Sequence, residues 1–208
     1  MTMDKLRFLY VLMCALLPYA YTKKALSRGD HALLTLCLAG TATADGLILL
    51  LGQNTAGVWV FCAVQIGYIA RYGLAVARNV KNSKARRRLT ATGLTALLLL
   101  CAWAVWLYKG TNWPAQTRAA CVYAPCLAGS VGFAAAAFIQ KAYPFPNKLL
   151  ILAGMVCFLL CDIHVGLYNL GIGYGWVNLG NIVTVIWLFY APSQLLLALS
   201  ALRYVTKR

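Results

Sequence analysis

The sequence predicts an all-α polytopic transmembrane helical bundle, and three observations support this fold class. Of the 208 residues, 62% are hydrophobic and only 11% are charged, whereas soluble domains average about 25% charged residues. The apolar residues form long runs, and a bilayer core about 30 Å thick takes roughly 20 apolar residues per helix. The basic residues lie between these runs, as they do in cytoplasmic loops. We therefore interpret residues 1–208 as a single transmembrane helical domain without a separate soluble catalytic domain.

The apolar runs, taken in order, predict seven spans. These are residues 6–22, 31–52, 55–77, 89–108, 118–140, 148–170 and 175–204. The last run is long and contains Pro192, which should kink it at membrane depth. Dividing this run into two helices is the alternative, and it would give eight spans.

The distribution of Lys and Arg predicts the orientation of the chain. With seven spans, 15 of the 19 Lys and Arg residues fall on one side of the membrane, which the positive-inside rule makes cytoplasmic. The N-terminus is then outside and the C-terminus cytoplasmic, whereas eight spans would divide the same charges 12 against 7. We interpret the basic run Lys81–Arg88 as part of this orientation signal. We therefore expect a multi-pass protein of the cell membrane and no nucleic-acid partner, despite the formal net charge of +15.

The eight cysteines all lie inside apolar runs, where free cysteine usually behaves as a small hydrophobic residue. Cys157 and Cys161 share a helix face, but two thiols without further ligands do not predict a metal site. We expect no disulfide, no metal and no cofactor.

Two of the four aspartates lie inside spans, and the chain contains no glutamate. Asp4 and Asp30 lie at the ends of spans, where a carboxylate needs no buried partner. Asp45 and Asp162 lie at bilayer depth, where an acid costs about 2.5–3.5 kcal/mol and faces the bundle or a wet cavity. Each follows the cytoplasmic start of its span by 14 residues, or about 21 Å of helix. The two carboxyl groups are therefore expected at one level of the membrane.

Further polar side chains occur at comparable depth. Gln65 and Tyr68 share a helix face at i, i+3, and Tyr190 and Gln194 do so at i, i+4. Neighbouring buried carboxyl groups are expected to share one proton, an arrangement suited to general acid–base catalysis. Two other interpretations stay open, a structural polar contact between helices and a proton or ion pathway.

His164 lies near the outer end of its span, and we expect it at the membrane interface.

Short motifs around these residues resemble, in the same order, those of the YhhN-like lysoplasmalogenase family of integral membrane proteins. The counterparts are Ala44-Asp45-Gly46, Gln65-Ile66-Gly67-Tyr68, Cys161-Asp162 and residues 189–196, together with the early residues 21–24. Gln65 stands where the family usually has His, Ala44 where it has Gly, and Cys161 where it has Ser. The family typically has eight spans, one more than the number predicted for this chain.

The resemblance implies hydrolysis of the alkenyl ether bond of lysoplasmalogens to a fatty aldehyde and a glycerophospho-base. The substrate would be a lysophospholipid within the lipid membrane. Our hypothesis is that Asp45 and Asp162 are the catalytic pair, because protonation of a vinyl ether carbon needs one neutral acid and one anion. The substrate-binding residues, which would orient water or the ether oxygen, are Gln65, Tyr68, Tyr190 and Gln194.

Two other functions were weighed against this one. A small proton-coupled transporter could use the same two acids. An intramembrane aspartyl protease also needs two acids, but residues 42–45 read Ala-Thr-Ala-Asp instead of Gly-x-Gly-Asp. The headgroup preference, the identity of the proton donor, the leaflet of entry and the oligomeric state are open at this point.

Overall fold

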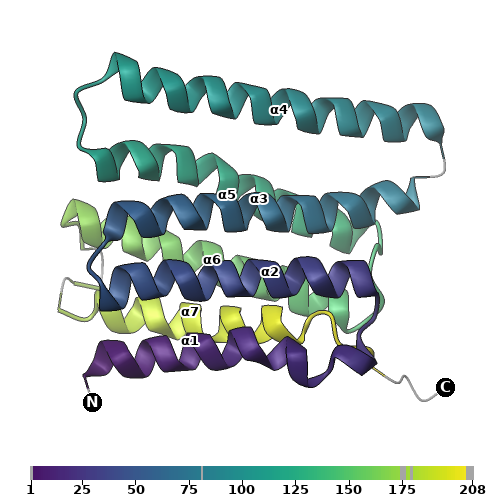
Figure 1. Cartoon of the computed structure of the whole chain (residues 1–208), viewed down its shortest axis with the longest axis horizontal. Helices are drawn as coiled ribbons and strands as arrows, with labels where there is room; N and C mark the ends of the chain where they lie inside the picture. Colours follow the sequence, from purple (N-terminus) through teal and green to yellow (C-terminus); the bar gives the residue numbers. More distant parts are fainter. Residues whose placement is uncertain (1, 81, 174–176, 179, 205–208) are drawn as a thin grey trace.

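A computed structural model of the chain describes residues 2–80, 82–173, 177–178 and 180–204, apart from the side chains of residues 85–90. The described residues form seven α-helices, which confirms the all-α fold class (Figure 1). The helices are α1 Met3–Ala20, α2 Arg28–Asp45, α3 Asn54–Asn79, α4 Ser83–Gly110, α5 Ala115–Ile139, α6 Asn147–Leu170 and α7 Ile182–Leu199. A 3-10 turn, Thr22–Lys24, follows α1, and a π-helical turn, Gly46–Leu50, continues α2.

Six of the helices are long and apolar enough to cross a membrane, which suggests a multi-pass membrane protein. These are α2 with its π-helical extension, α3, the part of α4 from Ala91, and α5, α6 and α7. Helix α1 is not among them, because Asp4, Lys5 and Arg7 fall in its first turns. The seventh span and the orientation of the termini stay predictions. Lys81 and residues 174–176, 179 and 205–208, which those predictions include, lie outside the described residues.

The last helix is shorter than the run that predicted it. Helix α7 begins at Ile182 instead of residue 175, and it continues through Pro192 to Leu199 as one helix. The Asn178 side chain accepts hydrogen bonds from the backbone N–H groups of Gly180 and Asn181, at 2.9 and 3.2 Å. Such side-chain-to-backbone bonds favour a turn over a helix, which agrees with the start of the helix after Asn181.

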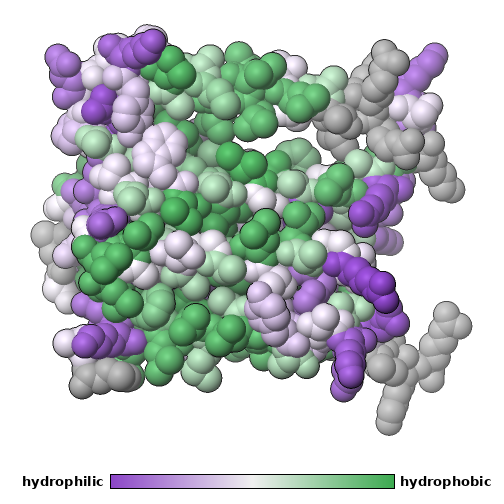
Figure 2. All heavy atoms as spheres, viewed as in Figure 1, coloured by the Kyte–Doolittle hydropathy of each residue, from purple (hydrophilic) through white to green (hydrophobic). Residues whose placement is uncertain are grey.

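The helices lie side by side in one bundle, with α4 apart from the others at one edge (Figure 1). Helix α3 packs against α2 and α5, and α6 packs against α7 and α5. A broad apolar band crosses the middle of the molecule, and hydrophilic side chains gather at its two ends (Figure 2). This distribution matches the hydrocarbon core and the two polar faces of a bilayer.

Asp30 and Arg71 form a buried ion pair near one end of the bundle, so the expectation that Asp30 needs no buried partner is wrong. The Arg71 side chain is fully buried, and its Nε and Nη2 donate to the two Asp30 oxygens at 2.9 and 2.8 Å. Arg71 Nη1 also donates to Ser200 Oγ at 3.0 Å. The Tyr143 hydroxyl donates to Asp30 Oδ1 at 2.6 Å. We call Asp30, Arg71, Tyr143 and Ser200 the ion-pair cluster.

The ion-pair cluster joins four parts of the chain, because its members come from α2, from α3, from the loop between α5 and α6, and from the residue directly after α7. Burial, and after it the negative charge of Asp30, raises the pKa of the Tyr143 hydroxyl, although Arg71 opposes this shift. The hydroxyl group therefore stays protonated and can donate a hydrogen bond to Asp30. Sequence position alone places Asp30 in the first turn of its helix, and packing against α3 buries it.

We predict that Asp30→Asn destabilises the protein by about 3 kcal/mol or more, because it leaves the Arg71 charge buried without its carboxylate. The matched control is Asp4→Asn, which breaks the exposed Arg7–Asp4 pair (3.1 Å) and should cost at most about 1 kcal/mol. Thermal unfolding of both variants in detergent measures the difference. Equal shifts in Tm would contradict a stabilising role for the buried pair.

Candidate active site

Asp45 is the last residue of α2 before the π-helical turn. Its side chain is buried, with 6% of the residue exposed, and the Tyr190 hydroxyl of α7 donates to its Oδ2 at 2.5 Å. A Cβ added to Gly57 of α3 would lie 3.0 Å from the carbonyl oxygen of Ala44. The start of α3 therefore lies close against the turn that carries Asp45. Local π-helical turns are frequent at functional sites.

Asp162 lies within α6, and it is held by a chain of side chains from two other helices. The Tyr123 hydroxyl of α5 donates to Asp162 Oδ2. Gln65 Nε2 of α3 donates to the Tyr123 oxygen at 3.2 Å, and Ser130 Oγ of α5 donates to Gln65 Oε1 at 2.6 Å. This chain fixes the orientation of the Gln65 amide, because one end must accept and the other must donate.

Aromatic side chains link the two acid–tyrosine pairs. Two aromatic rings connect the tyrosines: Phe158 contacts Tyr190 edge-on with centroids 5.8 Å apart, and it contacts Phe61 in the same way at 6.1 Å. Phe61 in turn lies 6.2 Å from Tyr123. We call Asp45, Asp162, Tyr123, Tyr190, Gln65 and Ser130 the acid cluster.

Exposure differs among the members of the acid cluster. Asp45 is buried, whereas Asp162 of α6 and Tyr123 of α5 are half-buried. Phe61 and Trp187, both half-buried, add apolar surface beside the acids. The two carboxyl groups therefore lie near aromatic side chains, and we call Phe61, Phe158 and Trp187 the aromatic wall. This combination of polar and apolar groups suits an amphiphilic ligand.

Four of the six predicted site residues belong to this cluster, and two do not. Tyr68 stacks on Tyr72 with ring centroids 5.8 Å apart, and its buried hydroxyl has no hydrogen-bond partner among the described residues. Gln194 is also fully buried, and neither its amide nitrogen nor its amide oxygen has such a partner. Neither residue is bonded to an acid.

His164 is buried instead of lying at the membrane interface, so that expectation is wrong. Its Nδ1 lies 2.6 Å from the Leu160 carbonyl oxygen, and its ring stacks on Phe189 of α7 with centroids 5.5 Å apart. The imidazole therefore packs in the interface between α6 and α7. Burial there follows from the extensive packing of α6 on α7.

The sequence analysis missed Tyr123 and Ser130. These residues are seven apart on α5, which places them on one helix face, and both bond to residues that were identified. That spacing of polar side chains within an apolar run was the available signal.

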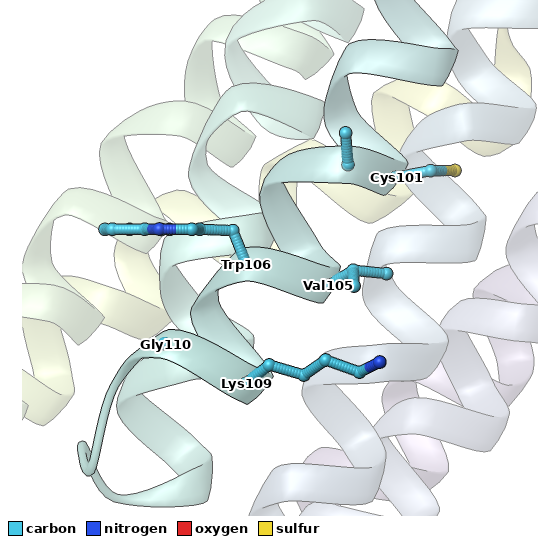
Figure 3. A pocket seen from close by; sticks show the side chains of 6 residues that line it. Cys101, Val105, Trp106, Lys109 and Gly110 are labelled. Atoms are coloured by element: carbon cyan, nitrogen blue, oxygen red, sulfur yellow. The ribbon is translucent and has the colours of Figure 1, made fainter.

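A hollow of about 580 Å³ lies on the surface of α4 (Figure 3). Its lining, which includes Cys101, Val105, Trp106 and Lys109, comes from α4 alone. It contains no acid and no member of the acid cluster.

Among the described residues, no group of three or more His, Cys, Asp or Glu side chains could hold a metal ion, and independence of metal stays a prediction.

A family model described as the YhhN family matches residues 5–201 of the chain. The match includes every member of the acid cluster and of the ion-pair cluster. No curated protein and no solved structure matches the chain.

We predict that Tyr190→Phe destabilises the protein by about 1–3 kcal/mol, because a buried carboxyl group loses its hydrogen-bond donor. The same change at the exposed Tyr168 (47% exposed) is the control and should have little effect. Thermal unfolding in detergent compares the two variants. If both lose the same stability, the Tyr190–Asp45 hydrogen bond does not stabilise the fold.

Proposed function

The chain belongs to the YhhN family, the family of lysoplasmalogenases, and we propose that it hydrolyses the alkenyl ether bond of lysoplasmalogens. The products would be a fatty aldehyde and a glycerophospho-base. The observation that carries the proposal is the acid cluster, in which a carboxyl group from α2 and one from α6 each accept a hydrogen bond from a tyrosine, and aromatic rings link the two tyrosines. Family membership supports a lysoplasmalogenase-like role, and the geometry supports the chemistry.

The reaction requires an acid and an anion at the same place. Protonation of the vinyl carbon that is β to the ether oxygen gives an oxocarbenium-like cation at the carbon bonded to oxygen, and water captures this cation to form a hemiacetal. The hemiacetal then breaks its bond to the glycerol oxygen, and the aldehyde leaves. One neutral carboxyl group donates the first proton, and the other, ionised, stabilises the cation and takes a proton from water. Paired carboxyl groups serve comparable states in glycosidases.

The neighbours of the acids have separate roles in this proposal. The Tyr123 and Tyr190 hydroxyl groups orient one carboxyl group each. Gln65 is a positioning residue, because it reaches Asp162 only through Tyr123. Tyr68 and Gln194, which carry unpartnered polar atoms, remain candidates for orienting water.

The location of the acid cluster suits a lipid substrate. Asp45 precedes the end of the π-helical turn at Leu50 by five residues, or about 7.5 Å of helix at the α-helical rise. A bond next to a glycerol backbone lies at a similar depth below the headgroup. The aromatic wall of Phe61, Phe158 and Trp187 offers apolar surface to the alkenyl chain.

A proton-coupled transporter is the second candidate, because buried carboxyl groups and a buried ion pair occur in the same bundle. Buried ionisable residues also mark proton pathways in transporters. Such a protein would move protons or solute across liposomes and would release no aldehyde.

We predict that Asp45→Asn and Asp162→Asn each reduce aldehyde release from lysoplasmenyl-ethanolamine at least about 100-fold, because each removes a proton-transferring group. The assay uses purified protein in detergent. Asp4→Asn, which changes an exposed aspartate, should keep full activity. Full activity in both site variants would refute the mechanism, and proton movement in liposomes without aldehyde release by the unaltered protein would favour transport.

We predict that Gln65→His keeps hydrolysis, whereas Gln65→Leu lowers kcat with little change in KM. An imidazole has one donor and one acceptor nitrogen, so it can donate to Tyr123 and accept from Ser130 as the amide does. Leucine can do neither, and Tyr123 then loses its orientation. Gln140→Leu, at an exposed position, is the control. Equal kcat values for the histidine and leucine variants would contradict the positioning role.

A further inference from the structure

We propose that water reaches the acid cluster through the bundle from the end that carries the ion-pair cluster, along a buried column of polar side chains on α3 and α7. This inference rests on the proposed function, because hydrolysis consumes one water molecule in each turnover and so requires a route for water. A lipid bound at the half-buried residues Asp162 and Tyr123 would cover them, so water needs a separate route.

Helix α7 connects the two clusters with one buried polar face. Tyr190 bonds to Asp45 in the acid cluster, and Ser200 accepts a hydrogen bond from Arg71 in the ion-pair cluster. Ser193 and Gln194 lie between them, and both are fully buried. Positions 190, 193 and 194 share a helix face, and position 200 is two turns beyond 193 on the same face. The ten residue steps from Tyr190 to Ser200 span about 15 Å.

Helix α3 connects the same two clusters. Gln65 belongs to the acid cluster and Arg71 to the ion-pair cluster. Between and beside them lie the stacked rings of Tyr68 and Tyr72, both fully buried. The Arg71 guanidinium lies 5.5 Å from the centre of the Tyr72 ring. The side chains therefore follow one another from the ion pair to the acids.

Both helices carry unpartnered polar atoms between the two clusters. Tyr68 Oη and Tyr72 Oη on α3, and Ser193 Oγ and both amide atoms of Gln194 on α7, are buried and have no hydrogen-bond partner among the described residues. A buried polar group without a partner costs about 1–3 kcal/mol, so these side chains together would carry a large penalty if their surroundings were dry. Internal water bonds to such groups in proteins. We therefore assign internal water to the space beside Tyr68, Ser193 and Gln194.

The column begins at a cavity. A cavity of about 520 Å³ is lined by Asp30, Arg71 and Tyr143 of the ion-pair cluster, and also by Gly29 and Arg78. Gly29 and Arg78 are exposed, so the cavity connects the ion pair to the surface at this end of the bundle. Water in the cavity reaches Arg71. Arg71 contacts Ser200, the first residue of the polar face that continues along α7, and Tyr72, the first residue of the polar face that continues along α3.

X-ray radiolytic labelling tests for the internal water directly, because radicals formed from bound water oxidise the side chains beside it. The full chain in lipid nanodiscs is mixed with H₂¹⁸O, irradiated without substrate, and analysed by mass spectrometry. We expect Tyr68 to be hydroxylated although none of its surface is exposed. We also expect its ¹⁸O content to rise with mixing time. Unmodified Tyr68 in the folded protein would overturn the proposal.

A pair of glycine substitutions tests the route. A Cβ added to Gly29 or to Gly93 meets no atom within 4 Å, so both positions can accept a large side chain. Gly29→Trp places an indole at the cavity and should slow the ¹⁸O exchange at Tyr68 severalfold. Gly93→Trp on α4 is the matched control and should leave it unchanged. Equal exchange in both variants would overturn the route.

The labelling experiment uses no substrate, so its result does not depend on the proposed hydrolysis. If the protein releases no aldehyde, but Tyr68 is labelled and Gly29→Trp slows the exchange, the water route is supported and the proposed function is refuted. If aldehyde is released while Tyr68 stays unlabelled, the function stands and the column falls.

Discussion

A carboxylate inside a bilayer must have a partner, and this constraint organises the bundle. Each of the three aspartates in the membrane-spanning helices is bonded to a side chain from another helix: Asp30 to Arg71 of α3, Asp45 to Tyr190 of α7, and Asp162 to Tyr123 of α5. An unpartnered acid at this depth costs several kcal/mol. The three contacts therefore set which helices lie together at each level of the membrane.

The same reasoning accounts for the position of α4. Apolar helices gain little from association in lipid, because the lipid chains are as apolar as their side chains. The described part of α4 buries only Leu107 completely, and its polar contacts are at its end, where Trp59 and Arg118 donate to Tyr108. With few polar contacts to hold it, α4 stands apart at the edge of the bundle (Figure 1).

The two polar clusters have different roles. The ion-pair cluster holds α2, α3 and α7 together and faces a cavity. In the proposed hydrolysis, the acid cluster would supply the proton donor and the anion. The polar faces of α3 and α7 link the two clusters, so the residues that stabilise the packing also lie along the proposed path of water. Stability and supply of the reactant then depend on the same side chains.

The helical class and six membrane-crossing runs follow from the amino-acid sequence alone. Asp45, Asp162 and Gln65 stand out as candidates because an acid or amide in an apolar run is visible without a structure, and Tyr190 stands out through its i, i+4 spacing to Gln194. The sequence did not reveal Tyr123 and Ser130, since a tyrosine or serine is unremarkable within an apolar span until a partner is known. Asp30 and His164 were misjudged for a related reason. Position along a helix indicates depth, but the neighbouring helices decide burial, and only the tertiary structure shows which helices those are.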